Sequence, residues 1–168
     1  CPRRARRCET AAVRLLEPLP LRGVHARNRV LFGPHETNLG SGRAFSARHL
    51  AYYERRMAGG TGSRVTEEAA GHGSDWPYER APLATSSGPG WEQIAAAGRR
   101  LGTITLAGIG HDGGQGTSAF SQRELWAPSG VPEVNTREVP KVMEPVDIAE
   151  VVAGFGDAAR LASARGMH

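Results

Sequence analysis

The sequence predicts an α/β fold in which parallel strands alternate with helices. Segments typical of strands and of helices alternate three times along the 168 residues. The connections that follow the strands are long, whereas those that follow the helices have two to four residues. The composition, with 39% hydrophobic and 23% charged residues, is typical of a globular protein. Together these observations indicate a parallel sheet or barrel covered by helices.

The first strand is predicted at residues 29–32, Arg-Val-Leu-Phe, and Gly33-Pro34 ends it. Ser46 is a suitable N-cap for a helix that runs to Met57. The apolar residues of this helix recur at helical spacing, which gives it one buried face: Leu50, Tyr53 and Met57. Gly59-Gly60 follows, where a C-terminal glycine is expected. His49, in the first turn of the helix, is expected to be exposed.

A second strand is predicted from Ser63 to Glu68, and a second helix from Trp91 to Leu101 with Gly102 at its end. Residues 103–107, Thr-Ile-Thr-Leu-Ala, are rich in β-branched side chains and form the third predicted strand. Because consecutive strand residues point to opposite faces, Glu67 and Glu68 cannot form a catalytic pair with each other.

The clearest helix is the last one, which Pro145 opens and Gly166 closes. Its predicted apolar face consists of Ile148, Val151, Val152, Phe155, Ala158, Ala159 and Ala162. The long connections cover residues 33–45, 68–90 and 108–144, and all three follow strands. In (β/α) barrels the active site is built from such loops at the C-terminal ends of the strands.

The basic charge belongs to the N-terminus. Lys and Arg number 21 against 17 Asp and Glu, and the first eight residues hold four Arg and no acid. We therefore expect residues 1–14 to be a disordered basic tail and residues 15–168 to be the domain. The balanced remainder argues against a nucleic-acid-binding face. Both cysteines, Cys1 and Cys8, lie in the tail, so the domain has no disulfide framework, which favours a cytoplasmic location.

Membrane and secretory proteins are not indicated. No run of about 18 apolar residues is present, and the N-terminus lacks the apolar stretch of a secretory signal. The segment Gly108-Ile-Gly-His-Asp-Gly113 matches the G-x-G-x-x-G pattern of dinucleotide-binding folds. Residues 114–130 do not have the sequence pattern of the helix that this motif requires. We therefore expect these glycines to allow a flat ligand or a backbone to approach the strand.

Metal ligation is a weaker interpretation of the six histidines, because none has the spacing of a common metal motif. A metal-dependent hydrolase would have to combine residues from two loops: His35, Glu36, His111 and Asp112. A non-catalytic half-barrel that assembles with a partner is a second alternative. No metal site is predicted.

Several ordered motifs resemble those of the Old Yellow Enzyme family of NADH:flavin oxidoreductases. They are residues 28–38 (Asn-Arg-Val-Leu-Phe-Gly-Pro-His-Glu-Thr-Asn), Tyr52-Tyr53, residues 55–62, Val65-Thr66-Glu67, Ala127-Pro128-Ser129 and residues 148–166. The segments His35-Glu36-Thr37 and Gly108 to Gly116 resemble the 2,4-dienoyl-CoA reductase-like branch, especially its mycofactocin-associated members. The resemblance extends over residues 15–168.

This resemblance implies the N-terminal part of a (β/α)8 TIM barrel: about three β/α units and the start of the fourth strand. Family members bind FMN, take a hydride from NAD(P)H and pass it to an enoyl or similar electrophilic substrate. An iron–sulfur cluster and FAD would belong only to a downstream part in this branch. Small-molecule substrates are thus implied, without nucleic acid or membrane, and either a monomer or an oligomer is compatible.

Position by position, the resemblance assigns FMN contacts to Gly33, Pro34, His35, Glu36, Thr37, Glu68 and Gly108. Gly108 stands where the family usually has Gln, and Gly114 replaces an Arg. Arg64 interrupts a normally apolar strand, which would be costly if it faced the core. The family's catalytic residues correspond to none of these positions. We therefore expect the 168-residue chain to be an incomplete barrel that is inactive alone.

Overall fold

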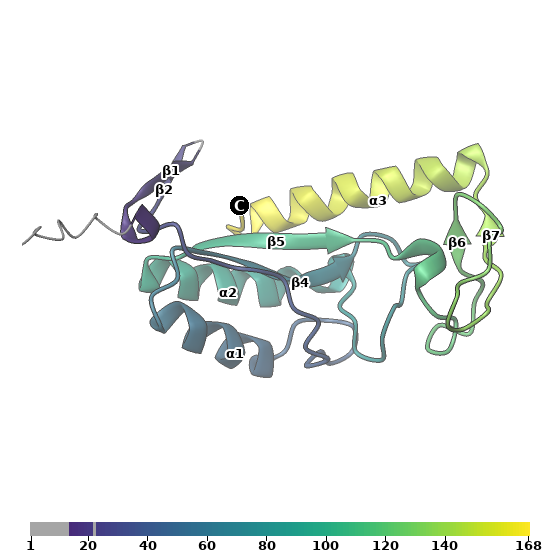
Figure 1. Cartoon of the computed structure of the whole chain (residues 1–168), viewed down its shortest axis with the longest axis horizontal. Helices are drawn as coiled ribbons and strands as arrows, with labels where there is room; N and C mark the ends of the chain where they lie inside the picture. The colour runs from purple at the N-terminus through teal and green to yellow at the C-terminus, as the bar shows by residue number, and fades with distance from the viewer. Residues whose placement is uncertain (1–13, 22) are drawn as a thin grey trace, which may run out of the picture.

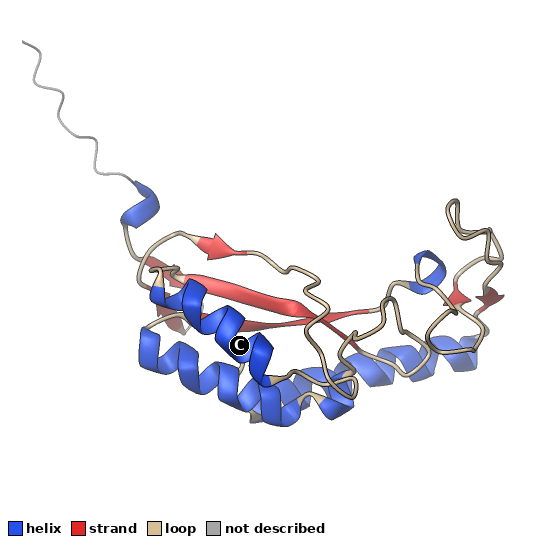
Figure 2. Ribbon diagram, turned by 90° about the horizontal axis from the view of Figure 1, so that it is seen from below, coloured by secondary structure: helices blue, strands red, loops and turns tan. Residues whose placement is uncertain are grey.

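The core of the fold is a parallel three-stranded sheet in the order β3-β4-β5, built from Leu31–Phe32, Ser63–Ala70 and Ile104–Gly110. The computed structural model describes residues 14–21 and 23–168. Three helices, α1 (Ala47–Ala58), α2 (Gly88–Leu101) and α3 (Pro145–Ala164), connect the strands or follow them (Figure 1). The helices lie along one side of the strands, as expected for part of a barrel wall (Figure 2).

Short elements complete the described chain. They are the 3-10 turns η1 (Arg14–Leu16), η2 (Ala84–Ser86) and η3 (Gly113–Gln115), and the short strands β1 (Leu19–Leu21), β2 (Val24–Ala26), β6 (Trp126–Ala127) and β7 (Lys141–Val142). β1 and β2 form an antiparallel hairpin, and β6 pairs with β7 in parallel. The described strands do not close into a barrel. Residues 1–13 of the predicted basic tail lie outside the described residues.

The cap of α1 confirms the predicted N-terminus but corrects one residue. Ser46 Oγ accepts a hydrogen bond from the Arg48 amide, and the Ser46 amide donates to His49 Nδ1. This capping box turns His49 inward, where it is fully buried, so the prediction that it is exposed was wrong. The helix ends at Gly59, and Gly60 adopts a φ of 104° that a residue without Cβ tolerates best.

Helix α2 begins three residues earlier than predicted, because Pro89 occupies its first turn and Ser87 precedes it. It ends at Gly102, whose φ of 64° is left-handed as expected for a terminating glycine. Trp91 and Ile94 of this helix are almost wholly buried. With Tyr53 and Met57 from α1, they form the centre of the hydrophobic core between the helices and the sheet.

Helix α3 runs along β5 with only part of its predicted apolar face buried. Ala158 and Ala162 are buried in the core, and Phe155 packs against Gly71. Ile148 and Val152, in contrast, are 47% and 65% exposed, so the predicted apolar face is buried only in part.

The last residues of the chain lie beside β5 in the position of a further strand. The His168 amide donates to Thr105 O at 2.9 Å, and the Ala107 amide donates to His168 O at 3.3 Å. This pairing agrees with the predicted start of a fourth strand. No helix in residues 14–21 and 23–168 has the length and hydropathy needed to cross a membrane.

Candidate functional site at the strand ends

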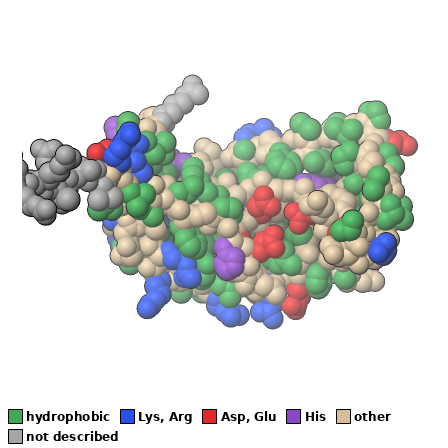
Figure 3. All heavy atoms as spheres, viewed as in Figure 1, with side chains coloured by type: hydrophobic (Ala, Val, Ile, Leu, Met, Phe, Trp, Pro, Cys, Tyr) green, Lys and Arg blue, Asp and Glu red, His purple; other side chains and the backbone are tan. Residues whose placement is uncertain are grey.

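The long loops after β3, β4 and β5 meet at the C-terminal edge of the sheet. Acidic side chains gather in the middle of the molecular face that Figure 3 shows, over this edge. We call Glu36, Glu68, Asp75 and Asp112 the strand-end carboxyl cluster, because their charges affect one another. Glu36 follows β3, Glu68 lies in β4, Asp75 follows β4 and Asp112 follows β5. Residues from three sequence segments thus converge on one edge.

The surroundings of the cluster raise the pKa of each of its carboxyl groups. Burial raises the pKa of Glu36 and of Glu68, and repulsion from Asp112 raises both further. Burial also raises the pKa of Asp112, against the influence of His111. The largest effect falls on Asp75, where burial and then Asp112 raise the pKa to about 7 although Arg43 opposes the shift. A protonated carboxyl group can donate a hydrogen bond, which a carboxylate cannot.

Glu67, next to the cluster, has the opposite character. Its side chain is fully buried, and Oε2 accepts hydrogen bonds from the amide (2.9 Å) and the hydroxyl of Thr37. Oε1 accepts from Tyr78 Oη at 3.0 Å, and His49 Nε2 lies 3.1 Å away from the same oxygen. Burial alone would raise the pKa of Glu67, but the contacts from His49 and Thr37 lower it below its ordinary value.

The tautomer of His49 follows from its two neighbours. Nδ1 accepts from the Ser46 amide, so the neutral ring carries its proton on Nε2, which faces Glu67. Nε2 lies 3.1 Å from Glu67 Oε1, but this contact is not aligned as a hydrogen bond, and Nε2 has no other acceptor among the described residues. Glu67 and His49 therefore connect the cap of α1 to the loop that carries Thr37, and so fix residues 35–37 beside the cluster.

A β-bulge explains the glycines of the G-x-G-x-x-G segment. The register between β4 and β5 shifts between Val65 and Glu68, so β4 carries an extra residue there. A Cβ on Gly108 would lie 2.6 Å from Thr66 O, and a Cβ on Gly110 would collide with the Glu68 carboxylate. Only the turn η3 follows β5, and no helix starts there. The segment thus lacks the helix of a dinucleotide-binding motif, as predicted.

The residues assigned to FMN contact are only partly brought together. Glu36 and Glu68 share the strand-end cluster, and Thr37 is hydrogen-bonded to Glu67 beside it. His35 Nδ1 lies 2.8 Å from Tyr52 Oη, and a Cβ on Gly33 would meet no atom within 4 Å, as an open surface requires. Pro34 follows Gly33 in the same loop. Gly108 is buried inside β5, where the bulge already accounts for it.

The four residues of the hydrolase alternative do not form a metal centre. His111 Nε2 lies 2.9 Å from Ser74 Oγ, and His35 is bonded to Tyr52. Within residues 14–21 and 23–168, no group of three His, Cys, Asp or Glu side chains has the arrangement of a metal site.

Two features of the site had only weak signals in the sequence. His49 stands three residues after the N-cap Ser46, where a side chain can reach back to the cap amide, and that position could have suggested its inward orientation. Asp75 lies in an irregular loop, and its nearness to Asp112 depends on how two long loops pack. Local pattern does not contain that information.

No protein-family model and no curated protein matches the sequence. Solved structures of similar fold do exist. A 2-naphthoyl-CoA reductase in complex with 2-naphthoyl-CoA aligns with a TM-score of 0.86 and 20% identity, over 92% of this chain and 26% of that one. The Old Yellow Enzyme homologue of Zymomonas mobilis aligns with a TM-score of 0.81 and 19% identity, over 91% of this chain and 46% of that one. Morphinone reductase in complex with tetrahydroNAD aligns with a TM-score of 0.83 and 18% identity, over 91% of this chain and 47% of that one.

These structures are Old Yellow Enzyme family members, and the chain spans between a quarter and half of their length. Below 25% identity, such a likeness is evidence about fold. The likeness confirms the predicted fold, the N-terminal part of a TIM barrel. The resemblance to the 2,4-dienoyl-CoA reductase-like branch stays a prediction. The chain therefore has the fold of the first β/α units of the Old Yellow Enzyme barrel.

Proposed function

We propose that the protein is a flavin-dependent oxidoreductase that binds FMN across the C-terminal ends of β3, β4 and β5. The observation that carries this proposal is the likeness in fold to Old Yellow Enzyme family members over more than nine-tenths of the chain. Among the segments that resemble the family, His35-Glu36-Thr37 and Gly108 to Gly116 lie at the same strand ends. The whole protein would take a hydride from NAD(P)H and reduce an enoyl or similar electrophile, in the cytoplasm.

The residues at the strand ends fit a flat, uncharged ring. Gly33 faces open space, so a planar group can approach the end of β3 without meeting a side chain. The isoalloxazine ring presents mainly hydrogen-bond acceptors along its polar edge, and ionised carboxylates would not bind them. Burial raises the pKa of Glu36, Glu68 and Asp112, and a carboxyl group of this kind can donate a hydrogen bond to such an acceptor when it is protonated.

When bound, FMN would supply the hydride chemistry. The residues of this chain would position it and tune its surroundings. Gly33 and Pro34 would lie along the ring, and Glu67 would hold Thr37 and its loop in place through two hydrogen bonds. In TIM barrels the phosphate is commonly held by the loops after strands 7 and 8, which lie outside the three described strands of this sheet.

The test is a titration of the isotope-labelled 168-residue chain with FMN, followed by NMR of the backbone amides. Binding should shift amides in residues 33–37 and near Glu68 and Asp112. Gly33→Val should weaken it at least about tenfold, because a branched side chain would occupy the ring's position. Gly73→Val is the matched control, since Gly73 also faces open space but lies outside the predicted contacts.

Saturable shifts that avoid the strand ends, or equal affinities of the two variants, would contradict the proposed site. NADH and NADPH oxidation by the chain alone is expected to be absent. Turnover with a stoichiometric, retained FMN would show instead that the chain is a complete catalyst.

A further inference from the structure

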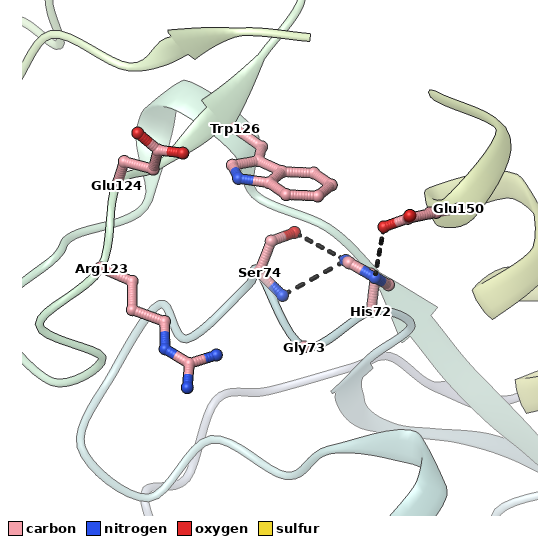
Figure 4. A pocket seen from close by; sticks show the side chains of 7 residues that line it. All are labelled: His72, Gly73, Ser74, Arg123, Glu124, Trp126 and Glu150. Carbon is pink, nitrogen blue, oxygen red and sulfur yellow. Dashed lines mark hydrogen bonds and ion pairs between the residues drawn. The ribbon is translucent and has the colours of Figure 1, made fainter. Parts of the chain in front are cut away.

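A second polar site lies beside the strand ends, in a cavity of about 580 Å³. It is lined by His72, Gly73, Ser74, Arg123, Glu124, Trp126 and Glu150 (Figure 4). These residues come from the loop after β4, the segment that enters β6, and the first half of α3. None of them belongs to the contacts predicted for FMN.

Ser74 is the hydrogen-bonded centre of this cavity. Its Oγ lies 2.9 Å from His72 Nδ1 on one side and 2.9 Å from His111 Nε2 on the other. The Ser74 amide also donates to His72 Nδ1, at 3.3 Å, so that nitrogen is an acceptor and carries no proton in the neutral ring. The hydroxyl proton of Ser74 must therefore point to His72, and His111 must donate to Ser74 Oγ through Nε2–H.

An acidic residue lies near the other nitrogen of His72, beyond hydrogen-bond distance. Because Nδ1 is unprotonated, the neutral His72 ring carries its proton on Nε2, which faces Glu150 Oε2 at 4.0 Å. The ring also packs at 33° to the Trp126 indole, with 5.2 Å between ring centres. A serine hydroxyl, an imidazole base that accepts its proton and a carboxylate behind that base form the arrangement of an activated nucleophile.

A cation lines the same cavity. Arg123 is among the residues that line it (Figure 4), and the Arg123 side chain makes no hydrogen bond or ion pair with the other described residues. The exposed Glu150 side chain, 56% accessible, shows that the cavity is open to solvent.

We propose that Ser74, with His72 as its base and Glu150 behind it, is a nucleophile for acyl transfer from small carboxylic esters or thioesters. Ser74 Oγ attacks the carbonyl carbon and forms the new C–O bond while its proton passes to His72 Nδ1. The bond to the leaving alcohol or thiol then breaks, and His72 protonates the leaving group. Water, deprotonated by His72, hydrolyses the acyl-serine and restores the hydroxyl.

Labelling of the intact 168-residue chain with a fluorophosphonate, which reacts with activated serines, tests this proposal directly. Peptide mass spectrometry should locate the label on Ser74. The matched comparison within the same chain is Ser129, which is exposed and has no histidine partner among its hydrogen bonds. Ser74 should react at least about 10²-fold faster than Ser129, the usual contribution of a positioned base.

Variants separate reactivity from folding. Ser74→Ala should abolish the label and the burst of alcohol released from p-nitrophenyl acetate, whereas Ser129→Ala should leave both unchanged. His72→Gln should slow labelling by about 10²-fold, with an unchanged cooperative melt by circular dichroism. Equal labelling of Ser74 and Ser129 in the wild-type chain would overturn the proposal and assign Ser74 a structural role in its loop. Because the readout involves no flavin, failure here is distinguishable from failure of the proposed FMN site.

Discussion

The two ends of β4 carry buried charges of opposite sign, and their surroundings differ. Arg64, at the start of the strand, and Glu67, near its end, are both fully inaccessible to solvent. Glu67 has hydrogen-bond donors from Thr37 and Tyr78, with His49 close by. Arg64 donates only to Val65 O, through Nη2 at 2.7 Å, and its Nε and Nη1 atoms have no partner among the described residues.

This difference follows the division of labour in a barrel, in which the C-terminal ends of the strands carry function and the N-terminal ends carry stability. Glu67 anchors a loop of the candidate site, so its partners come from three elements distant in sequence. Arg64 rests on the face of Tyr53, with Cζ 3.2 Å from the ring centre, and burial lowers the pKa of Arg64 to about 10. The buried charge of Glu67 thus organises the contacts around it, whereas the buried charge of Arg64 lowers the stability of the fold.

The largest expected effect is the loss of the Glu67 network. Glu67→Gln replaces one carboxylate oxygen by an NH2 group, so the donors of either Thr37 or Tyr78 lose their acceptor, and breaking a buried ionic network costs about 3–5 kcal/mol. The pKa of Glu67 in the folded state lies below its ordinary value. The contribution of Glu67 to the free energy of unfolding is therefore present above the ordinary pKa and is lost as pH falls through the folded pKa. At pH 7, urea unfolding should show a lower free energy of unfolding for Glu67→Gln than for the wild-type chain.

Glu68→Gln is the matched control, because the adjacent side chain belongs to the carboxyl cluster. Burial, Asp112 and Glu36 raise the pKa of Glu68, so removing its charge relieves repulsion and should leave the stability at pH 7 equal or higher. Equal destabilisation by the two variants would contradict the contrast between Glu67 and the cluster.

The second effect concerns Asp75, whose pKa of about 7 lies above its ordinary 3.8. The folded state therefore binds this proton more tightly than the unfolded state does, and stability declines as pH rises from about 4 through 7. Asp75→Asn should remove that decline and stabilise the protein at pH 8 by on the order of 3 kcal/mol, while changing little at pH 4. Unfolding free energies at pH 4, 6 and 8 provide the measurement.

Asp157→Asn serves as the control for Asp75→Asn, because the Asp157 side chain is 64% exposed and forms an ion pair with Arg160 on the helix surface. Its pH profile should follow that of the wild-type chain. Parallel profiles for Asp75→Asn and the wild type would show that Asp75 is ionised in the folded state at pH 6.

Local sequence signals predicted the elements around this site but not its interior. Ser46, Gly102 and Pro145 mark helix ends through short-range chemistry, and the structure has all three where they were predicted. The bulge at Thr66-Glu67 depends on the pairing of β4 with β5, which no local pattern encodes. The contact of His49 with Glu67 depends on a carboxylate 18 positions later in the sequence. The β1–β2 hairpin was missed because each strand has only three residues.

The smallest expected effect tests the other end of β4. Arg64→Met removes a charge with unpaired donors and keeps much of the side-chain volume, and replacing buried charges by apolar groups is often neutral or stabilising. The lost contact with the Tyr53 ring offsets part of the gain, so we expect a net stabilisation of about 1–2 kcal/mol. Arg55→Met is the control: Arg55 is exposed on the neighbouring helix α1, and a surface substitution there should change stability by less than about 0.5 kcal/mol. A loss of more than about 2 kcal/mol in Arg64→Met would show that Arg64, like Glu67, organises the fold around itself, and the contrast between the two ends of β4 would be wrong.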